Sequence, residues 1–132
     1  MHCHLSSQSM KLILAIGTGS FIGGILRYML SEIIQLRNST SFPIGTLTVN
    51  LLGCLFIGVI YGLAERSSLT EEWRLFLATG LLGGFTTFSA FSVETISLFR
   101  HGNFGIAIAY VAASILLGLI ATIAGFTILK LF

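Results

Sequence analysis

Short polar segments divide the chain into four long apolar stretches. The stretches cover approximately residues 11–36, 44–64, 75–99 and 104–129. Each has roughly the 20 residues that a helix needs to cross about 30 Å of hydrocarbon. The pattern therefore predicts an all-α integral membrane protein, with four transmembrane helices in a single membrane domain, residues 11–132. Residues 1–10 are expected to form a disordered tail.

The composition supports a membrane protein and argues against a soluble domain. Of the 132 residues, 55% are hydrophobic and 9% are charged, and the mean hydropathy is +0.96. The connections between the stretches are too short for a catalytic domain, and His2, His4 and His101 are peripheral and pair with no nucleophile. We expect no enzymatic activity and, without a basic patch, no nucleic-acid partner. Function must lie within or between the helices.

Positive charges are divided almost evenly between the two sides of the membrane. Four spans place both chain ends on one side, with four Lys and Arg residues there and three on the other. The first group is Lys11, Arg66, Arg74 and Lys130, and the second is Arg27, Arg37 and Arg100. An excess of these residues in short loops normally fixes orientation. The near tie predicts a weak orientation preference or insertion both ways round.

The third stretch carries polar groups that a plain membrane helix does not need. On an ideal helix three phenylalanines fall three residues apart, and three hydroxyl residues repeat that spacing about 100° round. They are Phe85, Phe88 and Phe91, and Thr86, Ser89 and Ser92. Positive ring edges and hydroxyl donors together can line the path of a small anion. The alternative is core packing of the rings, with hydroxyls bonded back to the preceding turn.

The same stretch contains a poor helix interior, because Gly83-Gly84 is followed by the β-branched pair Thr86-Thr87. An unwound turn at this depth would point bare carbonyls inward, as in other cation sites at the membrane midplane. We therefore predict that the third helix is broken near its middle. The corresponding functional hypothesis is an anion path beside a bound cation.

Polar residues in the other stretches are further candidates for ion contact. Thr46 and Asn50 share one face of the second stretch, and the Asn50 amide either donates to an ion or clamps a neighbouring helix. Arg27 either supplies positive potential at an anion vestibule or snorkels to the interface. Tyr110 and Ser114, one turn apart, either continue a polar track or form interhelical hydrogen bonds.

Three segments together resemble the signature of the Fluc family of bacterial fluoride channels, also called CrcB. They are Gly24-Ile-Leu-Arg27-Tyr28, Gly45-Thr-Leu-Thr-Val-Asn50-Leu-Leu-Gly53 and Gly83-Gly-Phe-Thr-Thr-Phe-Ser-Ala-Phe-Ser-Val-Glu94. The resemblance implies a fluoride-selective channel in the bacterial inner membrane that exports fluoride passively and confers resistance to it. It also implies an antiparallel, dual-topology homodimer in membrane lipid, with a structural sodium ion (Na+) at the dimer interface.

The resemblance also implies roles for single residues. Arg27 would stand in the vestibule, and Gly83 and Thr86 would offer backbone carbonyls to sodium. Where the family's polar track can carry a further serine, this chain has Gly118, so the far end of the track is expected to differ. The fluoride pore would be lined by Phe88, Phe91, Asn50, Thr46, Thr87, Ser89, Tyr110 and Ser114, with Glu94 as a candidate carboxylate of the pathway.

The main alternative is a small proton-coupled multidrug or anion exchanger of dual topology. Such an exchanger needs a titratable carboxylate deep in a span, conventionally the first, and residues 12–30 contain no Asp or Glu. Glu94 is the candidate substitute, although an ion pair with Arg100 or an interfacial position would also explain it. A non-transporting scaffold would not need the polar third stretch. The residues themselves indicate a small-anion path, whereas fluoride follows from the resemblance.

Overall fold

The structure is a computed structural model that describes residues 7–66 and 68–129. Within those ranges it is helical and has no strands. Its elements are α1 (Ser7–Arg37), α2 (Ile44–Glu65), α3 (Glu71–Arg74), the π-helical η1 (Leu75–Leu82), α4 (Gly83–Phe85), α5 (Phe88–Arg100) and α6 (Phe104–Ile128). Four helical segments are long and apolar enough to cross a membrane, the third being Glu71–Arg100. The predicted all-α architecture with four spans is confirmed.

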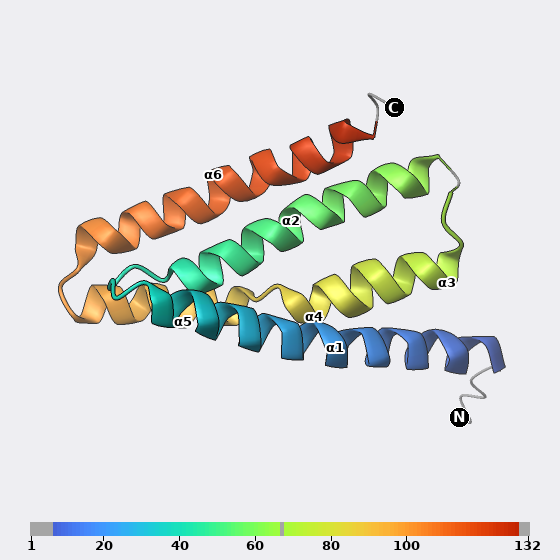
Figure 1. Ribbon diagram of the computed structural model, residues 1–132, viewed down its shortest axis with the longest axis horizontal. Coiled ribbons are helices and arrows are strands. Elements are labelled where there is room, and N and C mark those ends of the chain that lie inside the picture. The colour runs from blue at the N-terminus through green and yellow to red at the C-terminus, as the bar shows by residue number, and fades with distance from the viewer. Residues whose placement is uncertain (1–6, 67, 130–132) are drawn as a thin grey trace, which may run out of the picture.

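The helices form an elongated bundle in which α2 lies alongside α6, and α1 lies alongside η1 and α4 (Figure 1). The start of α1 and the end of α6 lie at the same end of the bundle (Figure 1). The predicted tail, residues 1–10, falls partly outside the described residues. Its last four residues, 7–10, are helical and belong to α1.

Large apolar side chains cover the outside of the bundle, and few are fully buried. Phe21, for example, is 71% exposed, whereas Val49 and Tyr110 are 0% exposed. A bundle in water would turn such side chains inward, because an exposed apolar surface of this extent favours association or lipid contact. The described part of the chain is therefore suited to hydrocarbon on most sides.

Close approach of helix backbones determines which faces meet. A Cβ atom on Gly23 of α1 would collide with the Leu81 carbonyl of η1, and one on Gly125 of α6 would collide with the Leu55 carbonyl of α2. Small residues at such crossings let membrane helices pack at backbone distance. These contacts hold the third span against α1 and α2 against α6.

The third span changes backbone conformation at Thr86 and Thr87. Gly83 is still helical, with φ −62° and ψ −37°. Thr86 (φ −86°, ψ 155°) and Thr87 (φ −147°, ψ 116°) are extended, and α5 begins at Phe88. The Ala90 N–H donates to the Thr87 hydroxyl at 3.1 Å, which caps the new helix. The span therefore runs as two helical arms joined by two extended residues.

Candidate functional site

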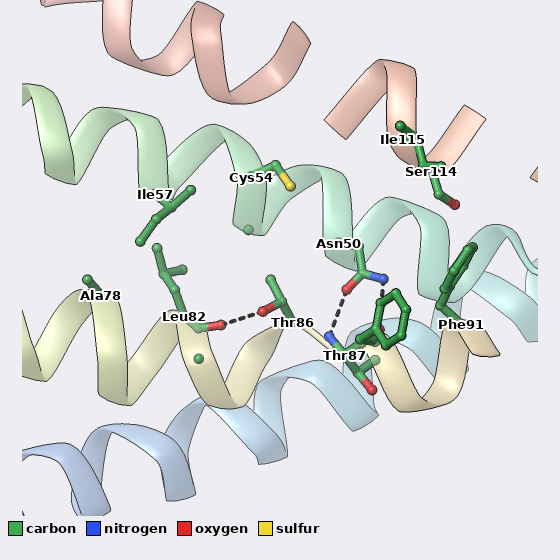
Figure 2. A pocket seen from close by; sticks show the side chains of 13 residues that line it. Asn50, Cys54, Ile57, Ala78, Leu82, Thr86, Thr87, Phe91, Ser114 and Ile115 are labelled. Carbon is green, nitrogen blue, oxygen red and sulfur yellow. Dashed lines mark hydrogen bonds between the residues drawn. The ribbon is translucent and has the colours of Figure 1, made fainter. Parts of the chain in front are cut away.

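The Asn50 side chain takes the place of a backbone partner for Thr87. Its Nδ2 group donates to the Thr87 carbonyl at 3.1 Å, and the Thr87 N–H donates to Asn50 Oδ1 at 2.8 Å (Figure 2). Both polar backbone groups of an extended residue are thereby satisfied inside the membrane span, where unsatisfied groups are costly. Asn50 thus clamps a neighbouring segment, and its second amide hydrogen remains able to donate to an ion.

The backbone around the extended residues presents carbonyl oxygens that a continuous helix would have used. The Thr86 N–H and the Thr86 hydroxyl both donate to the Leu82 carbonyl, at 2.9 Å each. The Thr87 N–H donates to Asn50, so the Gly83 carbonyl lacks the donor that a continuing helix would supply at residue 87. Carbonyl oxygens in this state can accept a hard cation.

The phenylalanine ridge expected on an ideal helix does not form as one ridge, because the extended residues intervene. Phe88 and Phe91 remain together, with ring centroids 5.5 Å apart, and Phe91 lies 5.2 Å from the Tyr110 ring. Phe85 instead lines an apolar hollow of about 450 Å³ with residues such as Leu26 and Phe56. The prediction that placed Phe85 in line with the other two rings is therefore wrong.

One hollow, of about 390 Å³, collects most of the predicted pore residues from α2, the third span and α6 (Figure 2). Phe88, at its edge, is 78% exposed. The Ser114 hydroxyl lines this hollow and is buried without a hydrogen-bond partner in the structure. A buried hydroxyl in that state indicates a place for water or an ion. The lining residues are Asn50, Gly53, Cys54, Ile57, Ala78, Leu82, Gly83, Thr86, Thr87, Phe88, Phe91, Ser114 and Ile115.

A second hollow, of about 190 Å³, lies beside Arg27 and also reaches Thr87. It includes Thr46 and Glu94, and the Nε atom of Arg27 is buried there without a hydrogen-bond partner. Thr87 is in the lining of both hollows. Polar groups therefore line both the hollow beside Arg27 and the hollow beside the two rings.

Glu94 is held by two hydroxyl groups. The Thr46 hydroxyl donates to Oε1 and the Tyr110 hydroxyl donates to Oε2, each at 2.6 Å. Both carboxyl oxygens of Glu94 therefore have a hydroxyl donor. Its partners are thus hydroxyls and not Arg100, so the suggested ion pair is replaced by hydrogen bonds among α2, α5 and α6.

Ser89 and Tyr110, both predicted to lie on the polar track, do not line the hollow that contains Ser114. Ser89 is exposed and lines neither hollow. Its hydroxyl lies 3.2 Å from the Thr87 hydroxyl. Tyr110 is bonded to Glu94 and does not line the hollow that Ser114 enters. At Gly118, a Cβ atom would stand 3.5 Å from the Cys54 sulfur, an ordinary van der Waals contact, so the Cys54 thiol is the neighbour at that end.

Comparison with known proteins identifies relatives of this chain. The family model described as CrcB-like protein, Camphor Resistance (CrcB), matches residues 14–126. This chain belongs to the CrcB family. Among curated proteins, it is 44% identical over 125 residues to the fluoride-specific ion channel FluC of Methylobacillus flagellatus, covering 92% of this chain and 97% of that protein. It is 50% identical over 117 residues to FluC of Chloroflexus aurantiacus, covering 88% and 93%.

The CrcB relationship and the four apolar helices together identify a multi-pass membrane protein. Sequence reasoning missed several lining residues of this CrcB chain, among them Ser31 and Glu32, which line hollows that also include Glu94. They follow Arg27-Tyr28 by one turn of α1, and that spacing was the available signal. The shared bonding of Thr46 and Tyr110 to one carboxylate had no such signal, because it joins three separate helices.

Proposed function

We propose that the chain is a fluoride channel and not an enzyme. It would let fluoride leave the cytoplasm passively and so lower cellular fluoride and protect against its toxicity. The observation that carries the proposal is the set of polar groups lining two hollows that share Thr87, in a chain whose curated relatives are named fluoride-specific ion channels. Fluoride is small and strongly hydrated, so a narrow path must replace its water with well-placed donors.

The proposed path begins at the Arg27 guanidinium, whose charge attracts an anion into the smaller hollow. It continues past the hydroxyl and amide donors of Thr87 and Asn50 to the ring edges of Phe88 and Phe91. Edges of aromatic rings carry partial positive charge and so accept a small anion without binding it as tightly as a cation would. Ser114, with its unpartnered hydroxyl, supplies a further donor on α6.

The proposed working unit is an antiparallel homodimer in a bacterial inner membrane. Phe88 and Gly83 line the hollow that Asn50 and Ser114 also line, and both are exposed, so a second copy would cover them. The near tie in positive charge supports insertion both ways round. A single cysteine introduced by Ser39→Cys, at an exposed position between α1 and α2 and in a background without other thiols, would then be labelled from outside cells in about half of the copies. Labelling of all copies or none would contradict dual topology.

We further propose that the Gly83 and Thr86 carbonyls bind a structural sodium ion at the dimer interface. Gly83 lacks its helical donor, and the carbonyl of extended Thr86 lies in the same turn, so these two residues from each copy would supply the oxygens that hard cations prefer. Bound sodium would supply a fixed positive charge beside the anion path. The chain's own part is to hold this backbone in place, through the Asn50 amide on Thr87 and the bond from the Thr86 N–H to the Leu82 carbonyl.

Fluoride efflux from proteoliposomes tests the function directly. With no pH gradient, we expect fluoride efflux and no comparable chloride efflux, measured with ion-selective electrodes. Comparable chloride flux would contradict fluoride selectivity. Glu94 is the observation that favours the rival exchanger, because it is a carboxylate within a span. A strict requirement for a proton gradient would support that exchanger and overturn the channel.

A further inference from the structure

The link between α1 and α2 is organised by the amide of Gln35, outside the segments already assigned to the path. Its Nε2 group donates to the Thr40 carbonyl at 3.2 Å and to the Phe42 carbonyl at 3.4 Å. Its Oε1 atom accepts from the Gly45 N–H at 3.2 Å, at the start of α2. One side chain therefore holds both the loop and the first turn of the following helix.

The loop end of this arrangement leads to Tyr110. The Phe42 ring meets the Tyr110 ring edge-on, with centroids 5.6 Å apart and planes at 79°. Phe42 and Phe91 both pack against the buried cluster that contains Tyr110. Because Tyr110 is 0% exposed, displacement of the Phe42 ring leaves a void beside a hydroxyl that donates to Glu94.

The helix end of the arrangement leads to Thr46, the residue after Gly45. The start of α2 also lies against α1, because a Cβ atom on Gly45 would collide with the Ser31 carbonyl. The Gln35 acceptor thus fixes the turn that presents the Thr46 hydroxyl to Glu94. Gln35 itself lines a hollow of about 360 Å³ that includes Thr46 and Glu94.

We propose that Gln35 is a positioning residue for conduction. Acting through Phe42 and Gly45, it would align both hydroxyl donors of Glu94 and, through Tyr110, the Phe91 ring. The proposal rests on the proposed channel function and deepens it. In this proposal, the α1–α2 connection positions the partners of Glu94, a residue of α5. Gln35 itself does not contact the ion.

The test uses Gln35→Met, which keeps the length of the side chain and removes all three hydrogen bonds. Fluoride efflux per reconstituted dimer is expected to fall about tenfold, the equivalent of roughly one or two net hydrogen bonds. Asn38→Ala is the matched control, because it removes one bond to the Ile34 carbonyl in the same region and leaves the Gly45 and Phe42 contacts. Its flux is expected to stay within about twofold of the unchanged chain.

Two further comparisons separate positioning from a general effect on folding. Phe42→Leu is expected to lower flux by about two- to tenfold, whereas Phe42→Tyr, which keeps the ring edge, retains it. In a Tyr110→Phe background, Gln35→Met is expected to cause a much smaller further loss than it causes alone. If Tyr110→Phe has no measurable flux, the Phe42 pair decides the question.

Several results would overturn the inference. Normal fluoride flux in Gln35→Met would do so, as would equal losses of flux in Gln35→Met and Asn38→Ala. Equal losses in both Phe42 variants would also do so. The same holds if Gln35→Met lowers flux by as large a factor in the Tyr110→Phe background as it does alone. A loss of flux that only follows loss of dimer on size-exclusion chromatography would also overturn it. Absence of fluoride flux in the unchanged chain would instead contradict the proposed function, so the two failures are distinguishable.

Discussion

Helix α6 and the third span cross the same bundle but satisfy their backbones differently. Helix α6 runs without interruption from Phe104 to Ile128, and its Thr122 hydroxyl donates back to the Gly118 carbonyl at 3.1 Å. The third span gives up helical conformation at two residues and depends on Asn50 of α2 for the backbone of Thr87. In hydrocarbon, a backbone group without a hydrogen-bond partner is costly, so the extended residues depend on Asn50. The polar groups available to an ion gather where that dependence occurs.

The strongest test of this contrast is Asn50→Leu, which keeps an apolar side chain of similar size and removes both partners of Thr87. Each buried backbone group left unsatisfied costs about 1–3 kcal/mol, so fluoride efflux should fall by more than about tenfold. The matched change in α6 is Thr122→Val, which removes only a bond to its own helix and should change flux by less than about twofold. Similar fluxes in both variants, measured per dimer in liposomes, would contradict the contrast.

A second test concerns the rings that follow the extended residues. Phe91→Ile removes two ring contacts, to Phe88 and Tyr110, and should lower fluoride efflux about tenfold. Phe88→Ile should also lower it sharply. Phe104→Ile in α6 changes an exposed ring outside both hollows and should leave efflux unchanged. Normal efflux from both Phe88→Ile and Phe91→Ile would exclude the rings from the path.

The sequence predicted most of the fold but only part of this contrast. The four spans follow from apolar length, because a membrane leaves few other ways to satisfy the backbone. The sequence also indicated Asn50 and the Thr86-Thr87 pair as unusual, yet it left open whether Asn50 clamps a helix or contacts an ion. That choice depends on how α2 docks against the third span, which close backbone contacts decide. For the same reason, the hydrogen bonds of Glu94 to α2 and α6 were not predictable from spacing within α5.

The smallest expected effect is that of Thr86→Val, and it sharpens the role given to the extended residues. The Thr86 hydroxyl donates to Leu82, and valine keeps the β-branched shape and the backbone carbonyl, so flux should change by less than about twofold. If sodium is held by carbonyls, the variant should also keep the sodium dependence of the unchanged chain, measured as flux after each alkali cation is removed in turn. Flux unaffected by every such removal in the unchanged chain would contradict the sodium proposal. Loss of the dependence in Thr86→Val alone would transfer the role from the carbonyl to the hydroxyl.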